Sequence, residues 1–325
     1  MSLEADQIVD RRRIRRKLTF WRVAAVLIAI GGVIALAAAM TGRTALTERT
    51  AGAIARVTIT GLIRSNQERV DALDRLGRSS ARAVIVHINS PGGTASGAEE
   101  LHGALVRLKA KKPLVVVIDG LAASGGYITA IAADHVVSLE TSMIGSIGVL
   151  LQYPNVSELM QKLGIKVETI RSSPLKAAPS GYEPTDPAAI EAMRAVILDT
   201  YAWFRGMVKE RRGLDDAGLE RVADGRVFTG RQALGLKLVD ALGNEQTAIS
   251  WLAREKNIDP QTPVRDFRLQ TRFGDFPFLR VAAFALEAVG LSSFARTFSD
   301  WSTLQTIESL NLDGVLMLWH PPAAN

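Results

Sequence analysis

A run of β-branched apolar residues passes directly into a turn of small residues, and this junction constrains the fold more than any other feature. The run is LVVVI at 114–118 and the turn is DGLAASGGY at 119–127. The run is typical of a strand buried on both faces, and the small residues at 128–133 predict a tightly packed helix. Ser124 therefore lies in a strand-to-helix turn, beside unpaired backbone N–H groups. It is either a helix N-cap or a nucleophile with donors for an oxyanion at hand.

A second strand with a glycine-rich turn precedes this one. Residues 83–89 predict a buried strand, 90–93 (SPGG) a turn, and 94–111 a helix with leucines at helical spacing. Strand, helix and strand in this order predict a parallel α/β sheet. Ligand sites of such sheets lie at the carboxyl ends of the strands, so both turns are expected at that edge.

The rest of the chain adds further strand and helix patterns. Strands are expected at 54–63, 135–139 and 165–170, and helices at 70–76, 156–163, 186–212 and 246–256. Residues 171–181 are expected to be irregular because they are rich in residues that break helices and strands. The sequence thus predicts an α/β domain over 54–256 that contains one irregular segment.

The N-terminal region has a charge pattern of its own. Residues 1–22 hold seven Lys and Arg against three Asp and Glu, which accounts for +4 of the formal charge of +6. The basic excess is therefore local, which argues against a nucleic-acid partner and for a membrane flank. Residues 23–40 are 18 positions without a charge, just enough to cross a bilayer as a helix. The positive-inside rule then places 1–19 in the cytoplasm and the chain after residue 40 outside.

An uncleaved signal anchor over 20–40 is favoured over a cleaved signal peptide, whose apolar core usually runs to about 7–15 residues. The chain contains no cysteine, which excludes disulfides and thiol catalysis.

A serine nucleophile needs a base. The four histidines fall in a strand, a helix, the start of a strand and the tail, and each is expected to be structural (His87, His102, His135 and His320). Lys176 lies in the irregular segment and is flanked by small and apolar residues. Burial in a dry pocket between this segment and the sheet edge would favour the neutral amine that a base requires. The alternative for Lys176 is an ordinary surface charge.

The turn at 90–93 supplies a third candidate element. Its glycines let the backbone approach a ligand closely and direct N–H groups at it. Together with the N–H of Gly125, the turn would form an oxyanion hole with two donors. The alternative is a strand-end turn whose glycines only supply positive φ angles.

Six short motifs follow one another along the chain: INSPGG at 88–93, AASGGY at 122–127, GSIGV at 145–149, SSPLK at 172–176, DGRVFTGRQA at 224–233 and LVD at 238–240. In sequence and order they resemble the motifs of signal peptide peptidases of the SppA type. The spacing of 52 residues from Ser124 to Lys176 agrees as well. The resemblance covers about 54–256 and corresponds to the short, single-domain form of that family.

The resemblance implies a serine protease with a Ser/Lys dyad on a ClpP/crotonase-like fold, an α/β fold with a parallel sheet. The family's nucleophile falls on Ser124 and its general base on Lys176. Its oxyanion donors fall on Gly93 and Gly125, and the serine that positions the lysine falls on Ser146. The family's mechanism implies neither a metal nor a cofactor.

These expectations define a domain order. A basic cytoplasmic segment (1–19) precedes one transmembrane signal anchor (20–40), a tether (41–53), the protease domain (54–256) and a C-terminal extension (257–325). The extension is expected to contact either the membrane surface or another copy of the chain. The implied protein is a homo-oligomeric endopeptidase of the cytoplasmic membrane, with its catalytic domain on the periplasmic side and cleaved signal peptides as substrates.

Three other functions remain open at this point. The first is a SohB-like membrane protease with other protein clients. The second is a crotonase-type enzyme acting on acyl thioesters, for which a membrane anchor would be unusual. The third is a non-catalytic membrane scaffold, which predicts that Ser124 does not react with acylating probes.

Overall fold

The computed structural model describes residues 52–269, residues 316–318 and eight separate positions between Lys17 and Gly32. Most of the predicted anchor at 20–40 and of the tether at 41–53 lies outside these residues, as does most of the predicted C-terminal extension. Within the residues described, no helix has the length and apolar character needed to span a bilayer.

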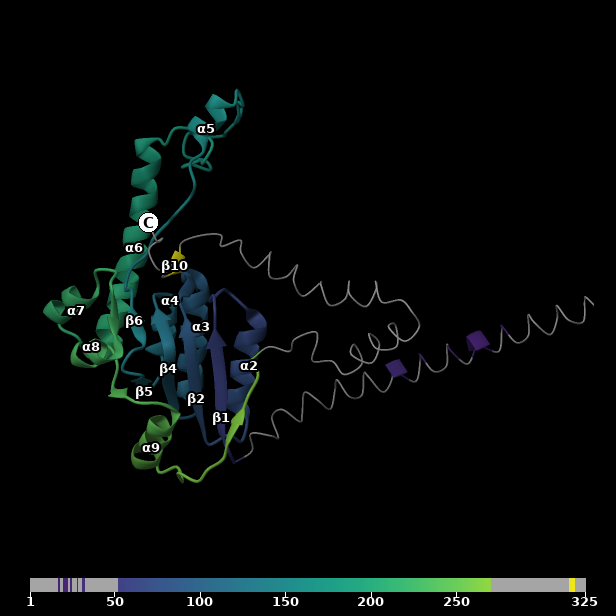
Figure 1. Cartoon of the computed structure of the whole chain (residues 1–325), viewed down its shortest axis with the longest axis vertical. Coiled ribbons are helices and arrows are strands. Elements are labelled where there is room, and N and C mark those ends of the chain that lie inside the picture. The colour runs from purple at the N-terminus through teal and green to yellow at the C-terminus, as the bar shows by residue number, and fades with distance from the viewer. Residues whose placement is uncertain are drawn as a thin grey trace, which may run out of the picture. The chain divides into compact units, whose positions relative to one another are not determined.

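In the described part of the chain, eight strands form one sheet (Figure 1). They are β1 (Ile54–Thr60), β2 (Ala83–Ser90), β4 (Leu114–Ala123), β5 (His135–Ser138), β6 (Met143–Gly145), β7 (Val227–Thr229), β8 (Ala241–Leu242) and β9 (Val264–Asp266). The main order is β7-β6-β4-β2-β1-β9, and β5 pairs with both β4 and β8. Every pairing is parallel except that of β6 with β7. The α/β class and the parallel sheet predicted from sequence are therefore confirmed.

Helices cover both faces of the sheet. Helices α2 (Gln67–Arg78), α3 (Ala95–Lys109) and α4 (Gly125–Ala130) pack on one face, and α9 (Glu245–Lys256) packs on the other. Successive residues of a strand point to opposite faces. Accordingly, Val84 and Val86 join the core under α2 and α3, whereas Ile85 joins the core under α9. Apolar residues on both faces explain why these strands read as continuous hydrophobic runs.

The long helix α6 (Pro187–Arg212) begins and ends where the sequence predicts. The side chain of Asp186 accepts a hydrogen bond from the backbone N–H of Ala188 at 2.9 Å, and proline occupies the first turn. Gly213 ends the helix in the left-handed conformation, with φ 58°. Near that end, α6 packs on the core through the fully buried side chains of Phe204 and Val208.

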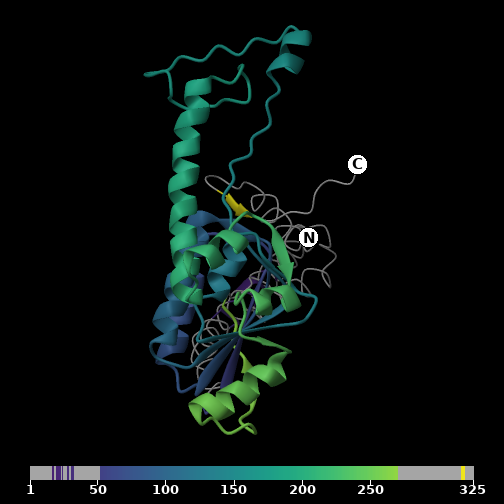
Figure 2. The same cartoon turned by 90° about the vertical axis from the view of Figure 1, so that its left-hand side faces the viewer.

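The N-terminal part of α6 and the short helix α5 (Ser157–Lys162) project away from the sheet (Figures 1 and 2). We call residues 150–198 the arm. The strand predicted at 165–170 is wrong, because this part of the arm has no regular structure. Its apolar side chains, Ile165, Val167 and Ile170, are exposed and join no sheet. Their β-branched character had suggested a buried strand.

The described residues beyond 256 include the strands β9 and β10. β9 pairs with β1 through Val264 opposite Ile54, so the sheet continues past the end expected for the protease domain. β10 (Leu316–Leu318) pairs antiparallel with β3 (Gly92–Thr94), a short strand formed by the glycine-rich turn that follows β2. The membrane-surface or oligomer contact predicted for 257–325 concerns residues largely outside those described, and it stays a prediction. Helices α7 (Asp216–Val222) and α8 (Gly230–Gly235) follow α6.

Candidate active site

Ser124 lies between the last residue of β4 and the first residue of α4. Its backbone has φ 54° and ψ −118°, a conformation that side-chain-bearing residues rarely adopt. Its side chain makes no capping hydrogen bond, although the residue occupies the N-cap position. The N-cap explanation of this serine therefore fails. Strain of this kind is concentrated at functional sites, where the surrounding structure imposes it.

The turn containing Gly93 packs directly against the start of α4. A Cβ atom placed on Gly92 would lie 2.9 Å from the backbone N of Gly125, and Gly92 has φ +103°. A Cβ atom placed on Gly93 would overlap the carbonyl oxygen of Ile63. Only glycine fits this approach, and the structure therefore brings the two predicted oxyanion elements together beside Ser124.

Ser90 fixes the shape of that turn. Its side chain is fully buried, donates a hydrogen bond to the carbonyl oxygen of Gly61 at 2.7 Å and accepts one from the N–H of Gly92 at 3.1 Å. Because this buried hydroxyl both donates and accepts a hydrogen bond, it holds the neighbouring backbone in place. The sequence pattern places this serine in the turn but gives no signal of its positioning role.

Ser146 lies on the neighbouring strand end. It follows Gly145, whose carbonyl oxygen accepts a 2.7 Å hydrogen bond from the N–H of Ser124. Ser146 also has a positive φ of 51°, and its N–H donates to the carbonyl oxygen of Arg226 at 2.8 Å. Arg226 belongs to the motif at 224–233, which forms β7 beside β6. The motif at 224–233 therefore has a structural role, because its backbone holds the turn that contains Ser146.

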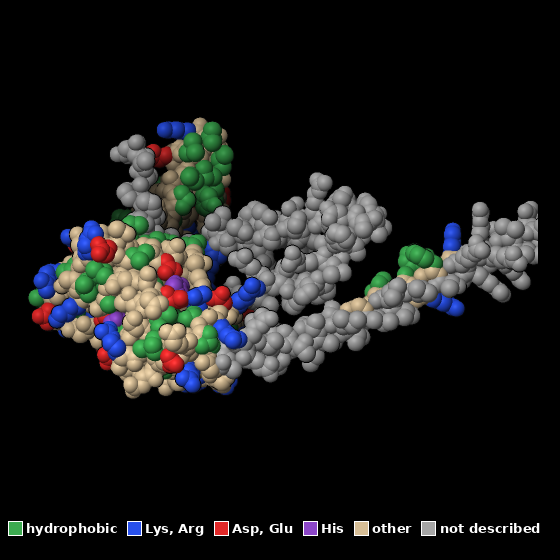
Figure 3. Space-filling model, turned by 60° about the horizontal axis from the view of Figure 1, so that its bottom comes forward, with side chains coloured by type: hydrophobic (Ala, Val, Ile, Leu, Met, Phe, Trp, Pro, Cys, Tyr) green, Lys and Arg blue, Asp and Glu red, His purple; other side chains and the backbone are tan. Residues whose placement is uncertain are grey.

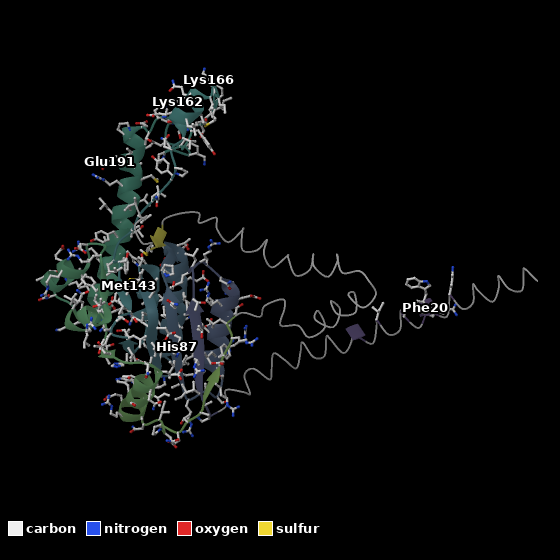
Figure 4. All side chains as sticks on the ribbon, viewed as in Figure 1. Phe20, His87, Met143, Lys162, Lys166 and Glu191 are labelled. Carbon is white, nitrogen blue, oxygen red and sulfur yellow. The ribbon has the colours of Figure 1, made fainter. Side chains whose placement is uncertain are left out.

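Lys176 lies in the arm, whereas Ser124 and the two glycine turns lie at the ends of the central strands. It is exposed in the irregular part of the arm, and its backbone N–H donates to the carbonyl oxygen of Ser173 at 3.1 Å. Figure 4 labels Lys162 and Lys166 at the far end of the arm and Met143, the first residue of β6, within the body. No hydrogen bond in the described part of the chain joins the Lys176 amine to Ser124. The Ser/Lys dyad expected from the sequence therefore stays a prediction.

Two histidines pack in the hydrophobic cores, one on each face of the sheet. The Nδ1 of His102 lies 2.7 Å from the carbonyl oxygen of Ile128, in helix α4. Burial lowers the pKa of His102 below its ordinary value, so the buried ring is neutral at pH 7. The ring of His135 stacks on Trp251 with centroids 4.7 Å apart, and burial lowers its pKa as well. His320 lies outside the described residues.

The remaining histidine belongs to a polar cluster at the side of the sheet covered by α9. The Nδ1 of His87 lies 2.9 Å from Asp119, and its Nε2 lies 2.9 Å from Glu245. Arg56 donates to both carboxylate oxygens of Glu245, at 2.6 and 2.7 Å. This double hydrogen bond is the main reason that the pKa of Glu245 is lowered. None of the three described histidines is bonded to Ser124.

The known proteins that resemble this chain include several peptidases. The model of peptidase family S49 matches residues 106–259. A protein of Synechocystis sp. that is named as a candidate protease is 35% identical over 209 residues, which cover 64% of this chain and 76% of that protein. A candidate signal peptide peptidase SppA of Enterococcus faecium is 29% identical, covering 57% of this chain and 54% of its own length. A candidate protease SohB of Haemophilus influenzae is 30% identical, covering 59% of this chain and 54% of its own length.

Among solved structures, a point mutant of ClpP1 from Listeria monocytogenes is 18% identical with a TM-score of 0.41, covering 62% of this chain and 95% of that one. The match to the Synechocystis protein covers more than two thirds of that relative at above 30% identity, and the family model spans α4, Ser146 and Lys176. The chain belongs to peptidase family S49.

Proposed function

We propose that this chain is a membrane-anchored serine endopeptidase in which Ser124 is the nucleophile and Lys176 the general base. The observation that carries the proposal is the conformation of Ser124. A serine held at φ 54° without a capping bond, between Gly93 and Gly125, has the requirements of a nucleophile and lacks those of a structural residue.

The base comes from a second copy of the chain. Lys176 is exposed on an arm that projects from the body, so the described part of its own chain does not bury it. The arm also carries most of the large apolar side chains that are exposed in the described residues: Leu159, Leu163, Ile165, Val167, Ile170, Leu175, Tyr182, Ile190, Val196 and Leu198. Hydrophobic side chains are visible together on the projecting part of the molecule in Figure 3. Exposed apolar surface of this extent is typical of a protein–protein contact, and docking of the arm on a neighbour would bury Lys176.

The reaction follows from these positions. Neutral Lys176 takes the proton of the Ser124 hydroxyl, and the oxygen attacks the carbonyl carbon of a peptide bond. The backbone N–H groups of Gly93 and Gly125 stabilise the resulting oxyanion. Lys176 then donates its proton to the leaving amine, and a water molecule hydrolyses the ester on Ser124. Ser146 holds the lysine amine in position through a hydrogen bond.

The proposed substrates are apolar peptides that remain in the membrane after secretion, cleaved signal peptides above all. The charge pattern of 1–22 and the uncharged stretch at 23–40 support an anchor that holds the catalytic domain at the periplasmic face of the cytoplasmic membrane. A SohB-like protease with other protein clients is the alternative. Sequence identity does not favour either function, since the two named relatives are 29% and 30% identical.

Hydrolysis of a fluorogenic peptide with small or apolar residues around the cleaved bond tests the proposal. Full-length wild type, Ser124→Ala and Lys176→Ala are compared in detergent. We expect activity in the wild type alone, together with phosphonylation of the wild-type serine by a fluorophosphonate probe, with loss of fluoride. Full activity of Lys176→Ala would overturn the assignment of the base. A wild type whose Ser124 does not react with the probe would support the scaffold function.

A further inference from the structure

The segment of the arm that carries Lys176 is exposed along its length, with one exception. From residue 161 to residue 177, every residue is exposed except Arg171. The side chain of Arg171 is 20% exposed, and its Nη2 donates a 2.8 Å hydrogen bond to Oε1 of Glu183, whose side chain is 33% exposed. Arg171 precedes Lys176 by five residues, and Glu183 follows it by seven. This ion pair therefore joins the two ends of the segment around the lysine.

The two ends of the segment are held in different ways. The side-chain amide of Asn155 donates to the carbonyl oxygen of Glu183 at 3.0 Å, and the N–H of Val156 donates to the carbonyl oxygen of Gly181 at 2.8 Å. These bonds fix the Glu183 end through its backbone. The backbone of Arg171 makes no hydrogen bond to another described residue. The Arg171 end is therefore held by its side chain.

Between these ends, the backbone around Lys176 forms a tight turn. The N–H of Lys176 donates to the carbonyl oxygen of Ser173 at 3.1 Å, and the N–H of Ala178 donates to that of Leu175 at 3.3 Å. Ala177, the residue after the lysine, has a φ of 59°, which residues with a side chain rarely adopt. Closing a loop at its ends reduces the number of conformations open to its backbone. The ion pair thereby limits the directions in which the Lys176 amine can point.

The guanidinium of Arg171 is buried at a cost that stability alone does not explain. Its Nε is buried and has no hydrogen-bond partner among the described residues. An unsatisfied buried donor reduces the stability of the folded state, and a partly exposed ion pair contributes little in return. This combination is expected where a charged pair holds a segment in one position.

We propose that Arg171 and Glu183 are positioning residues for the general base, and that their ion pair fixes the turn from which Lys176 reaches Ser124. The proposal rests on the proposed function, since it takes Lys176 as the base. It deepens that function by naming the side chains that orient the lysine. An amine held in the reactive direction loses less conformational freedom when it enters the site. The ion pair therefore acts on the chemical step and leaves peptide binding unchanged.

Two neutral substitutions test the proposal, because they change the local charge in opposite directions. Arg171→Gln removes a positive charge and Glu183→Gln removes a negative one, but each breaks the ion pair. An effect of charge alone would raise the midpoint of the pH–rate profile in Arg171→Gln and lower it in Glu183→Gln, with the maximal rate unchanged. That result would overturn the proposal, since loss of positioning should reduce the maximal rate in both variants.

The rates are measured with the fluorogenic peptide on full-length proteins. We expect kcat to fall roughly tenfold in Arg171→Gln and in Glu183→Gln, with little change in KM. The double variant Arg171→Glu, Glu183→Arg should recover most of the lost kcat, because it forms the ion pair again with its charges exchanged. A residue that only fills space would not be rescued in this way.

A second ion pair of the same arm provides the matched control. Lys166 and Glu168 lie 3.5 Å apart, with side chains that are 89% and 80% exposed. Lys166→Gln and Glu168→Gln make the same two changes of charge and should keep the wild-type kcat. Equal kcat in Arg171→Gln and Lys166→Gln would overturn the proposal. A charge-exchanged double variant no faster than the single variants would overturn it as well.

Amide hydrogen exchange gives a readout that does not depend on activity. The Ser124→Ala chain is compared with and without Arg171→Gln. We expect the amides of Lys176 and Ala178 to lose protection in the variant, while those of residues 200–212 in α6 stay protected. Unchanged protection of both amides would contradict the proposal, because the turn would then keep its shape without the ion pair.

These outcomes are separable from those of the proposed function. Full activity of Lys176→Ala would overturn the base itself, whatever the rates of the Arg171 and Glu183 variants. An inactive Lys176→Ala together with wild-type rates in both glutamine variants would leave the base in place and remove only its positioning pair.

Discussion

The backbone N–H of Ser124 donates a 2.7 Å hydrogen bond to the carbonyl oxygen of Gly145. This bond joins the end of β4 to the end of β6, and the residue after Gly145 is Ser146. This one backbone hydrogen bond therefore links the candidate nucleophile to the serine that is predicted to position the base. Both serines have positive φ angles, 54° and 51°, which the surrounding hydrogen bonds impose.

The first prediction concerns the strain at Ser124. Ser124→Ala and Ser124→Gly both remove the hydroxyl, but only glycine adopts φ 54° and ψ −118° without a steric penalty. Such strain costs about 1–3 kcal/mol, and glycine loses roughly 0.5–1 kcal/mol through the entropy of its unfolded chain. Ser124→Gly should therefore be about 1 kcal/mol more stable than Ser124→Ala in urea unfolding.

A helix position provides the control for this comparison. Ala104 lies inside α3, where replacement by glycine should reduce stability by about 1 kcal/mol. The sign of the alanine-to-glycine change should thus be opposite at residues 124 and 104. If glycine also proves the less stable residue at 124, the conformation of the serine is not strained in solution.

The second prediction concerns the close approach at Gly93. Gly93→Ala would bring a methyl group onto the carbonyl oxygen of Ile63, so β3 has to shift. Overpacking of this kind costs roughly 1–3 kcal/mol, and a shifted β3 would misplace an oxyanion donor. We expect lower stability in urea and a rate of phosphonylation by the fluorophosphonate probe that falls on the order of a hundredfold.

The matched control is Gly120→Ala, in β4. A Cβ atom there would lie 3.4 Å from Oδ1 of Asn89, which is an ordinary contact. This variant should keep both its stability and its reactivity. A Gly93→Ala protein that reacts as fast as Gly120→Ala would show that the N–H of Gly93 takes no part in the reaction.

Local patterns were sufficient to predict the strands β1, β2, β4 and β5 and the turn at Ser124. The β-branched runs of β2 and β4 are each followed by glycines, and at Gly93 only glycine fits. The pairing of residues 316–318 with β3 could not be predicted in this way, because it joins residues more than 200 positions apart and leaves no periodic pattern. The position of Lys176 could not be predicted either, because it depends on how far α6 extends from the sheet.

The strand wrongly predicted at 165–170 has a related cause. Ile165, Val167 and Ile170 have the composition of a buried strand, yet they are exposed on the arm. An apolar, β-branched composition indicates that a segment is buried against other apolar residues. It does not report whether its own domain or another copy of the chain provides those residues.

The third prediction concerns pH. Because the pKa of His102 is lowered, chiefly by burial and then by the charges of Arg211 and Lys109, the folded state keeps the ring neutral where the unfolded state takes up a proton. The stability that this neutral ring supports is present above the unfolded pKa of about 6.5 and is lost as the pH falls below it. Urea unfolding of the wild type should show lower stability at pH 5.5 than at pH 7.5.

The variant His102→Asn retains a donor for the carbonyl oxygen of Ile128 but does not titrate. It should reduce the difference between the two pH values by about 1 kcal/mol or less. Some dependence should remain, because burial also lowers the pKa of His135. An unchanged difference in His102→Asn would show that the ring is protonated equally in both states.

The last prediction separates a dyad shared between two copies from one formed within a single copy. Full-length Ser124→Ala and Lys176→Ala should each be inactive toward the fluorogenic peptide. Suppose that the arm of one copy supplies the lysine to the serine of another. Assemblies that contain both variants then have some intact sites. In each of these sites, a Lys176→Ala copy supplies Ser124 and a Ser124→Ala copy supplies Lys176. Random mixing in a closed ring gives about a quarter of the sites this composition, so about a quarter of wild-type activity should return.

The control mixes Ser124→Ala with the double variant Ser124→Ala, Lys176→Ala, which cannot regain activity in either arrangement. Energy transfer between copies labelled with two dyes establishes that the variants have exchanged into common assemblies. Exchange without any return of activity would mean that each chain uses its own lysine, and the arm would then have to fold back over its own body. Activity restored to about the expected quarter would instead explain why Lys176 is exposed in one chain and why the arm around it is apolar.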